Sequence, residues 1–543
     1  MRRTILLRAS FLSAAALAAA LACVERGDDL VPRHSVRLDI TVKRSNTGER
    51  IPARIYLSKG GRPFRLSPVD TLLPLHPDLF YRERVWRRSS ESSVLEVTAR
   101  GESHFVLLDG TGSFDLPAAP HYRIEAYHGT FFRPAAAEFA LQFGEDSHIE
   151  VALDPVAPGI QDQWLAGDGH IHLVRAREDD SLFLRWMQAE QLAVANFLEL
   201  QRQQHAAMQW GFGERAEARA AGHSIRSGHE SRSRFYGHTL FLGPDRMVLP
   251  LSVGLEYANQ ALAFPHPMVL FQRGRELGAL TGFAHLYGSQ PNSTLLMNLA
   301  HGTIDFVEVF QFGVLKTDEW YELLNAGFRV VGLAGSDFPA NLSRFPAWPR
   351  ALPLLGPERA LVQADPGESA YQAWEDGVRA GRVLLTNGPL LEFAAGGSRA
   401  GATVEWAGES HLVRCVAKAY YFRPITSLEI ILNGEVVARA DGGGDAERLS
   451  MDASIELRES GWLAARATAT TLEGEPPILA HTNPVYFHRE GRRVRVESAR
   501  KALRERWRVE AGHYRSSGLT FPDAESFESF LAGVERTTRA LAD

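Results

Sequence analysis

The sequence predicts a multidomain protein in which a central α/β barrel lies between two β-sandwiches and is followed by a helical tail. A length of 543 residues corresponds to roughly three or four domains at ~150 residues each. Short strand-like runs separated by turn residues fill residues 36–155 and 394–490, whereas strand-like and helix-like runs alternate over 160–393. Hydrophobic residues make up 45% of the chain, which supplies ample material for the cores.

Residues 1–22 have the composition of an export signal peptide. Arg2 and Arg3 precede a run that is almost entirely apolar or small, and Ala20-Leu21-Ala22 has the pattern of a cleavage site. We therefore expect a bacterial protein that is exported and cleaved before Cys23. The paired arginines also fit a twin-arginine signal, and a short transmembrane anchor is the alternative to cleavage.

The mature protein is expected in the periplasm, or on a membrane as a lipoprotein if Cys23 carries a lipid. The residue three positions before Cys23 is Ala20 rather than the usual leucine, so the sequence leaves the lipid anchor open. No other segment approaches the ~20 apolar residues of a membrane span, so we expect no transmembrane span in the mature chain.

Residues 36–155 are predicted to form an N-terminal β-sandwich. Val36, Leu38, Ile40 and Val42 alternate with other residues, as on a strand with one buried face. Turn residues separate this strand from the short strand-like runs that follow, and this arrangement is typical of a sandwich. We interpret the region as a spacer without chemistry of its own.

Residues 160–393 alternate between strand-like and helix-like runs. Buried apolar runs at 193–200 and 330–334 are separated by helix-like segments such as 268–276 and 318–325. This alternation favours an α/β barrel or a layered sheet. In α/β barrels the functional site forms at the carboxyl ends of the strands, so polar residues that directly follow strands are the candidate site residues.

Residues 394–490 return to β character, and Asn433-Gly434 has the sequence of a tight hairpin turn. We predict a second β-sandwich here. From 491 to 543 the chain is charged and helix-like, with helices expected over 496–509 and 524–541. This tail is expected to pack on a neighbouring domain.

The run Gly167-Asp168-Gly169-His170-Ile171-His172-Leu173 carries the strongest sign of chemistry. Alternate residues of a strand leave the same face, so Asp168, His170 and His172 would project together from one strand end. Two imidazoles and a carboxylate are groups that hold divalent metal ions. The chain has 19 histidines, so a His-x-His spacing arises readily by chance, and a site depends on ligands from later segments.

Further candidate ligands follow where the barrel interpretation places strand ends. Each one alone is more simply a surface or capping residue, and only their recurrence at strand ends favours a shared site. They are Glu230 after Gly228-His229, His238 after Gly237, His285 after Gly282-Phe283-Ala284, Glu308 after Asp305-Phe306-Val307, and Asp337 after Gly335-Ser336.

Composition limits which kinds of functional site and partner we expect. The chain has two cysteines, Cys23 and Cys415, so we expect neither a disulfide framework nor a cysteine-based metal site, and His, Asp and Glu must hold any metal. A net charge of −6 and the lack of a long Lys/Arg run argue against a nucleic-acid partner. The sequence contains no Gly-x-Ser-x-Gly motif, which disfavours a serine nucleophile.

The order of these motifs resembles that of the PHP (polymerase and histidinol phosphatase) superfamily: His-x-His, a Glu shortly before Gly-His, a lone His after a strand, a Glu, and Gly-Ser-Asp. The segment 381–391, with Thr386-Asn387-Gly388-Pro389, is similar to the signature of the CehA/McbA-type metallohydrolase branch. The resemblance covers about residues 160–393. It implies a distorted (β/α)7 barrel that binds two or three divalent metal ions and performs hydrolysis.

Carried over residue by residue, the resemblance implies that His170, His172, Glu230, His285 and Asp337 are metal ligands. Glu230 would be the carboxylate that bridges paired ions. His238, our candidate catalytic residue, is implied as a proton shuttle or a further ligand, and Glu308 as a residue in or beside the site.

Two departures from the family pattern bear on the number of ions. Where the family commonly has Thr-Asp-His, this chain has Asn196-Phe197-Leu198-Glu199-Leu200, so Glu199 would have to substitute for the histidine. Where the family often has Ser-Asp-x-His, the chain has Ser336-Asp337-Phe338-Pro339. Asp168, Asp179 and Asp180 are further carboxylates near the His-x-His run. We therefore expect one to three ions, or a degenerate site.

We expect a metal-dependent hydrolase that uses Zn²⁺ or Mn²⁺, because His and carboxylate ligands suit these ions better than Ca²⁺. The expected substrate is a small-molecule ester, carbamate, amide or phosphoester, with Arg232 and Arg234 pairing an anionic group. The alternative is a non-catalytic exported binding protein on a degenerate barrel, which the missing histidines and the two β modules favour.

Overall fold

The computed structural model describes most of the chain after the predicted leader. The described residues are 35–64, 72–75, 85–88, 94–99, 102–201, 206–254, 262–290, 292–345, 348–363, 369–516 and 518–542. The expected signal peptide, its cleavage site and Cys23 lie outside these residues. Among the helices of the described part, none is long and apolar enough to span a membrane.

Two antiparallel-rich sheets pack face to face in the N-terminal region. The smaller sheet has the order β10 (Phe132–Arg133), β12 (Ser147–Pro155), β1 (Ser35–Arg44), β8 (Thr111–Pro117). The larger sheet has the order β11 (Ala135–Leu141), β9 (Ala119–Tyr127), β2 (Ala53–Lys59), β7 (Glu102–Leu107), β6 (Val94–Ala99), β5 (Val85–Arg88), β4 (Leu72–Leu75), with β3 (Arg62–Pro63) paired to β2.

The predicted alternation on the first strand defines the core of this sandwich. Val36, Leu38, Ile40 and Val42 of β1 are all buried against apolar residues of the facing sheet, such as Ile124 of β9. The strand pairs with β12 in parallel and with β8 antiparallel, so it is the interior strand of its sheet.

The central region begins at β13 and contains the His-x-His run. Its elements are β13 (Trp164–Ile171), α2 (Asp180–Ala189), β14 (Val194–Gln201), β15 (Ala206–Ala207), β16 (Ala218–Ala220), β17 (His223–Ser233), β18 (Gly237–Leu242), α3 (Pro267–Glu276), β19 (Leu280–Phe283), α4 (His285–Gly288), α5 (Leu295–Ala300), β20 (Phe306–Gln311), β21 (Val314–Leu315), α6 (Thr317–Asn325), β22 (Val331–Ala334), β23 (Arg359–Gln363), α7 (Ala370–Arg379) and β24 (Val383–Thr386).

The central strands form a mixed sheet, and the expected (β/α)7 barrel is not confirmed. The pairs β13–β14, β14–β17, β19–β20 and β20–β22 are parallel. The pairs β17–β18, β18–β19, β13–β23 and β23–β24 are antiparallel. A three-residue turn joins β17 directly to β18, with Gly237 at φ 77°, so this connection is a hairpin and not a crossover helix.

The C-terminal region is again β-rich. Its strands are β25 (Leu390–Ala395), β26 (Thr403–Trp406), β27 (His411–Tyr420), β28 (Ile425–Leu432), β29 (Glu435–Asp441), β30 (Arg448–Leu457), β31 (Gly461–Ala469), β32 (Ile478–Thr482) and β33 (Val485–Arg489). The turn at Asn433-Gly434 joins β28 to β29 as predicted, with both residues at positive φ. Hydrogen bonds between β24 and β32 make this region continuous with the central sheet.

The Thr386-Asn387-Gly388-Pro389 segment lies at the junction between the central and C-terminal regions. The Thr386 hydroxyl donates to Pro389 O at 2.7 Å and accepts the Gly388 N–H at 2.9 Å. The Asn387 side chain accepts from Leu479 N and donates to Pro477 O. The segment is therefore a tight turn that fixes β24 to the neighbouring β-domain.

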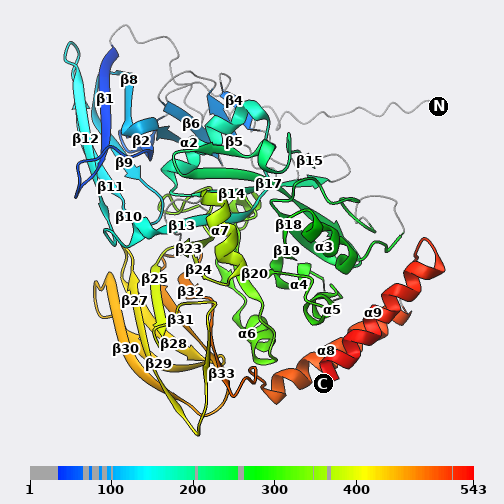
Figure 1. Ribbon diagram of the computed structural model, residues 1–543. Coiled ribbons are helices and arrows are strands. Elements are labelled where there is room, and N and C mark those ends of the chain that lie inside the picture. The colour runs from blue at the N-terminus through cyan, green and yellow to red at the C-terminus, as the bar shows by residue number, and fades with distance from the viewer. Residues whose placement is uncertain are drawn as a thin grey trace, which may run out of the picture.

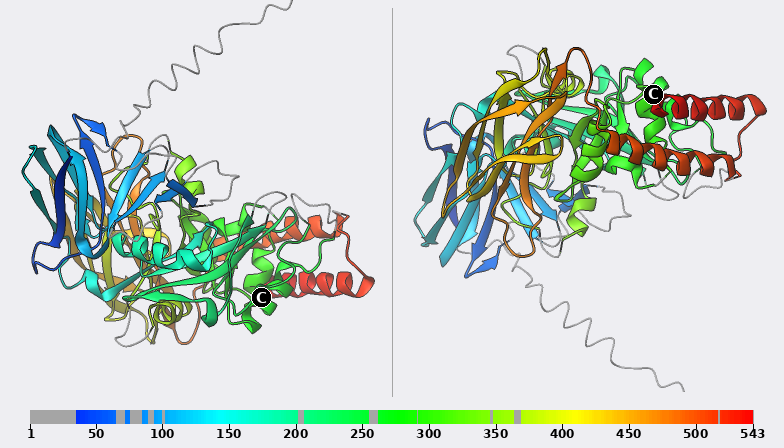
Figure 2. Two further views of the ribbon diagram at one scale, coloured as in Figure 1. Left: turned by 90° about the horizontal axis from the view of Figure 1, so that it is seen from above. Right: turned by 90° about the horizontal axis from the view of Figure 1, so that it is seen from below.

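Two helices, α8 (Glu497–Ser516) and α9 (Ala524–Ala542), form the tail. They lie side by side at the end of the molecule opposite the two β-rich regions (Figures 1 and 2). Trp507 of α8 and Phe530 of α9 are buried in the core of the central region. The tail thus packs on the neighbouring domain, as its apolar positions predicted.

Candidate metal centre

The two histidines of the His-x-His run lie at the carboxyl end of β13 and converge. Both side chains are fully buried, and the two Nε2 atoms are 3.0 Å apart. The backbone fixes the second one, because the His172 N–H donates to Phe338 O at 2.7 Å. Two imidazole nitrogens this close need either a shared proton or a shared cation between them.

Glu230 from β17 and Asp337 from the loop after β22 complete this group. His172 Nε2 lies 3.2 Å from Glu230 Oε2 and 3.4 Å from Asp337 Oδ1. His170 Nε2 lies 3.6 Å from the same Asp337 oxygen and 4.0 Å from Glu230 Oε1. Bonds of about 2.0–2.1 Å to a tetrahedral Zn²⁺ place neighbouring ligand atoms about 3.3 Å apart, so these separations bracket the geometry of a single ion.

Glu308 of β20 orients His170 from behind. Its Oε1 accepts the His170 Nδ1–H at 2.9 Å, which leaves the Nε2 lone pair directed at the group. Its Oε2 accepts the His285 backbone N–H at 3.0 Å and lies 3.4 Å from His285 Nδ1. Glu308 therefore links two of the predicted ligands from beneath.

A second group of donor atoms shares Glu230 with the first. Glu230 Oε1 lies 2.9 Å from His238 Nδ1, and the His238 and His285 ring centroids are 5.3 Å apart. The donor atoms of Glu230, His238 and His285 lie within 4.8 Å of one another. One Glu230 oxygen thus faces each group, as a carboxylate that bridges two cations requires.

Two of the predicted ligands have left-handed backbones. His285 has φ 53° and Asp337 has φ 51°, a conformation that is uncommon for residues other than Gly, although Asp and His adopt it more often than most. Beside them, a Cβ at Gly335 would lie 2.4 Å from Glu308 Oε1 and 2.7 Å from His170 Cβ. Strain and close backbone approach of this kind cluster at functional sites, where the surroundings impose them.

The charges of this group favour a bound cation. Burial lowers the pKa of His170, but Glu308, Asp337 and Glu230 outweigh burial and raise that pKa to about 10. Burial raises the pKa of Glu308, but His170 and its hydrogen bonds outweigh burial and lower it to about 2. Asp337 Oδ1 and Glu230 Oε1 are buried and have no hydrogen-bond donor among the described residues. The carboxylates and imidazoles present fit a divalent metal ion.

Asp168 lies beneath the group rather than in it. Its Oδ1 accepts the N–H groups of His170 at 2.9 Å and Ser336 at 3.1 Å, and its Oδ2 accepts the Ser336 hydroxyl. Burial raises the pKa of Asp168 to about 6, although these hydrogen bonds oppose the rise. Asp168 therefore joins the His-x-His strand to the Asp337 loop.

Of the two predicted substrate-binding arginines, the structure brings one to the group. Arg232 is buried, and its Nε donates to Glu230 Oε2 at 2.6 Å. Arg234 is exposed, and its guanidinium lies 5.0 Å from the centroid of the Phe235 ring. The end of β17 at Ser233 explains the difference: Glu230 and Arg232 share a face of the strand, and Arg234 lies in the turn beyond it.

The other candidate carboxylates do not join the group. The Glu199 carboxylate accepts the Gln209 N–H at 2.7 Å, and burial raises its pKa. Asp180 is paired with Arg175. Pro339 stands where the pattern noted above has its second histidine, and the preceding Phe338 packs on Trp186, with ring centroids 6.0 Å apart.

Sequence analysis missed residues that hold His285. Gln311 Oε1 lies 2.6 Å from His285 Nδ1, and Lys316 Nζ donates to His285 O at 2.9 Å. Gln311 is the last residue of the strand that carries Glu308, so its place at a strand end was the available signal. Lys316 follows that strand after a short turn and gave no such signal.

Comparisons with known proteins find weak structural similarity. No protein-family model and no curated protein matches the chain. The structure of PsfC from Pseudomonas syringae PB-5123 is 15% identical, over 39% of this chain and 88% of that one, with a TM-score of 0.27. A complex of Endonuclease Q with a 27-mer duplex substrate is 14% identical, over 40% and 56%, with a TM-score of 0.27. The endonuclease PfuEndoQ from Pyrococcus furiosus is 13% identical, over 40% and 55%, with a TM-score of 0.24.

These similarities do not identify a family or a branch for this chain. TM-scores of 0.27 and 0.24 are too low to support an argument about chemistry. One expectation is corrected. One similar protein is described in complex with a 27-mer duplex substrate, so the exclusion of a nucleic-acid partner from net charge and composition is withdrawn.

Proposed function

We propose that this chain is an exported divalent-metal-dependent hydrolase of the PHP type, in the CehA/McbA-type branch. One observation carries the proposal: the Nε2 atoms of His170 and His172 lie 3.0 Å apart, and each lies 3.2–4.0 Å from carboxylate oxygens of Glu230 and Asp337, which come from two further segments. This spacing suits one ion, and the surplus of buried carboxylate needs positive charge. The bond cleaved is an ester, a carbamate or amide, or a phosphoester.

The donor set also supports a choice of metal. Two imidazoles and two carboxylates suit Zn²⁺ or Mn²⁺, and the second group around Glu230 would hold a further ion if His238 acted as a ligand instead of as a proton-transfer group. When bound, such ions supply a Lewis acid and lower the pKa of a bound water toward about 7. The chain itself supplies the geometry, because Glu308 holds His170 and the Asp168–Ser336 hydrogen bonds hold the loop of Asp337.

His238 is proposed as the group that moves a proton. Its Nδ1 faces Glu230 Oε1 at 2.9 Å, and its side chain is 18% exposed, whereas the Glu230 side chain is fully buried. Burial lowers the pKa of His238 despite the opposing charge of Glu230, so the imidazole is neutral near pH 7 and can accept a proton at Nε2. Arg232 is proposed to hold Glu230 in place rather than to bind substrate, because its Nε is already bonded to that carboxylate.

A metal and activity assay tests the proposal. The purified mature chain is analysed for bound metals and then assayed on matched panels of esters, carbamates, amides, phosphomonoesters and phosphodiesters. We expect at least about one ion per chain, and hydrolysis that a chelator abolishes and Zn²⁺ or Mn²⁺ restores. Less than one ion per chain together with no hydrolysis would support the alternative, a non-catalytic binding protein on a degenerate site.

Export is a separate part of the proposal and has its own test. Fractionation of a bacterium that expresses the full chain should place the protein in the periplasm or, if Cys23 carries a lipid, in the membrane fraction. N-terminal analysis of the mature protein should begin at Cys23. A cytoplasmic protein that still begins at Met1 would contradict export without bearing on hydrolysis.

A further inference from the structure

A cavity that none of the candidate metal ligands lines lies between the helical tail and the C-terminal β-domain. It has a volume of about 760 Å³ and is lined by residues of α5, α8, α9, the loop after α6 and the segment before α8. Pockets that bind small organic molecules have volumes of about 300–1,000 Å³. The cavity is therefore large enough for such a molecule.

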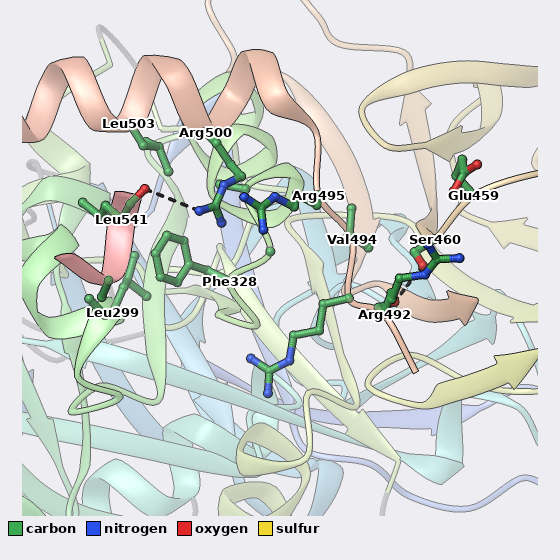
Figure 3. A pocket seen from close by; sticks show the side chains of 15 residues that line it. Leu299, Phe328, Glu459, Ser460, Arg492, Val494, Arg495, Arg500, Leu503 and Leu541 are labelled. Carbon is green, nitrogen blue, oxygen red and sulfur yellow. Dashed lines mark hydrogen bonds between the residues drawn. The ribbon is translucent and has the colours of Figure 1, made fainter. Parts of the chain in front are cut away.

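The floor of this cavity is apolar. Leu503 of α8 and Leu541 of α9 are buried, whereas Leu299 of α5 and Phe328 are half-buried and pack against the same core. Figure 3 shows the Phe328 ring between the side chains of Leu299 and Leu503. A hydrocarbon or aryl body placed there would bury apolar surface that the fold leaves open.

Four arginines also line the cavity. Arg492, Arg493, Arg495 and Arg500 all line the cavity, against a single acidic residue, Glu459. Glu459 is 79% exposed and is paired with Arg489 at 3.2 Å. This local excess of positive charge stands in a chain whose net charge is −6, so overall composition does not account for it.

Existing contacts do not neutralise all four guanidinium groups. Arg492 pairs with Glu490 at 2.8 Å, and Arg500 Nη2 donates to Leu541 O at 3.4 Å. Arg493 has no ion-pair partner among the residues that the structure describes. Figure 3 shows the Arg495 and Arg500 guanidinium groups directed into the same space, above Phe328. Glu497 at the start of α8 interacts with both guanidinium groups but is already paired with Arg504, so the arginines at the cavity outnumber the carboxylates near them.

The backbone that carries these cations is fixed. Val494 is buried between Arg493 and Arg495, and the Val496 N–H donates to Asn325 O at 2.8 Å at the end of α6. A Cβ at Gly327 would lie 2.8 Å from Val494 O, so the two segments are in close contact. The arginines are therefore held at the cavity by the fold, as a binding site requires.

We propose that this cavity binds an amphiphilic anion, a carboxylate or phosphate group joined to a hydrocarbon or aryl body. The arginines bind the charged group in the bidentate manner for which guanidinium is suited, and the leucine and phenylalanine floor takes the body. The site is independent of the proposed hydrolytic centre, so its ligand is neither the substrate nor the metal.

Calorimetry on the full mature chain tests the site with decyl phosphate as the probe. We expect saturable binding that is at least about tenfold tighter than that of inorganic phosphate and of decanol, because each lacks half of the recognised chemistry. The double variant Arg493→Ser/Arg495→Ser should weaken decyl phosphate binding at least about tenfold. Both side chains are exposed, so its thermal unfolding should match that of the native chain.

The matched control is Arg515→Ser. Arg515 is an exposed arginine of α8 and lies about 22 Å along that helix from Arg500, at a rise of 1.5 Å per residue. It should bind decyl phosphate as the native chain does. Equal affinity in the native chain and the double variant would overturn the proposal, as would equal affinity for decanol. Binding to phosphatidylglycerol vesicles without binding to soluble decyl phosphate would also overturn it and would assign the arginines to a membrane surface.

Discussion

Two buried groups of charged side chains in this molecule differ in how their charges are balanced. At the junction of the N-terminal sandwich and the central region, the Glu190 carboxylate is paired with Arg54 at 2.8 Å and lies close to Arg359. The guanidinium groups there also donate to backbone oxygens of Arg350, Leu352 and Gly356. Each arginine in that group has a carboxylate or carbonyl oxygen within reach, although both Glu190 oxygens lack a hydrogen bond of good geometry.

The group at the end of β13 has the opposite imbalance. Glu230, Glu308 and Asp337 are buried there with imidazoles as their main partners, and Arg232 contacts Glu230 alone among the three. Three carboxylates therefore face a single guanidinium there, whereas two guanidinium groups surround Glu190. The comparison teaches that burial of charge does not by itself mark a site; buried carboxylates that outnumber their fixed cations do.

The largest effect is expected from removing a proposed ligand of the group at the end of β13. His170→Ala or Asp337→Ala removes one donor atom of the proposed ion, so we expect loss of bound metal and of hydrolysis together. Loss of a direct ligand should exceed the about 10–100-fold effect of losing a residue that only orients one. Metal analysis and rate measurements check this, with the exposed Glu178→Ala as control. Unchanged metal content in both variants would contradict the ligand set.

A different result is expected from His238→Ala, which tests whether this residue moves a proton or holds an ion. Removal of a proton-transfer group typically lowers the rate about 10²–10⁴-fold. Metal content should stay close to that of the native chain, because the first group of donor atoms does not include His238. If metal is lost in proportion to rate, His238 belongs among the ligands.

Disruption of the Arg54–Glu190 pair should lower the free energy of unfolding and leave the metal content unchanged. Arg54→Met leaves Glu190 buried without its closest cation, and breaking such a pair costs about 3–5 kcal/mol. Urea unfolding measures the loss, and bound metal per folded chain should be unchanged. The matched control is Arg37→Met at the exposed pair with Asp39, where a change within about 1 kcal/mol is expected.

Glu308→Gln should have an effect of intermediate size. The variant keeps the shape of the residue that orients His170. The amide no longer carries the negative charge that the His170 Nδ1–H faces at 2.9 Å. Metal affinity should fall about 10–100-fold, with the ligands themselves intact. Competition with a chelator of known affinity measures the change. An unchanged affinity would show that Glu308 does not set the orientation of His170.

Much of the site was predictable from position at strand ends. His170, His172 and Glu230 lie at or near the carboxyl ends of β13 and β17, Asp337 follows the apolar run 330–334, and strand ends from one sheet edge meet in space. The role of Asp168 was not predictable, because its orientation depends on Ser336, which is 168 residues away in the chain. The positive φ of His285 could not be predicted from the sequence either.

The architecture was predictable in its order of domains but not in its sheet. Strand and helix patterns gave the β, α/β, β and helical regions, and the hairpin at Asn433-Gly434, from local periodicity alone. The antiparallel pairing of β17 with β18 depends on a three-residue turn within a motif that alternation alone assigned to a barrel. The ion pair of Arg54 with Glu190 joins separate domains, so no local pattern could reveal it.

The smallest expected effect concerns a buried histidine outside both groups. His481 donates from Nδ1 to Thr482 O, its Nε2 accepts from the Tyr321 hydroxyl, and burial lowers its pKa to about 3. The folded chain keeps this residue neutral while the unfolded chain takes up a proton below about pH 6.5. Its contribution to stability is therefore complete above that pH and falls by about 1.4 kcal/mol per unit as the pH drops toward 3.

Urea unfolding of the native chain and of His481→Gln at pH 7.5 and pH 5 measures this contribution. These pH values lie about one unit or more on either side of the ordinary histidine pKa, and the variant should show the smaller pH dependence. Equal slopes would mean that the protonated imidazole is tolerated in the fold, and that acid sensitivity comes from the carboxylate-rich group at β13.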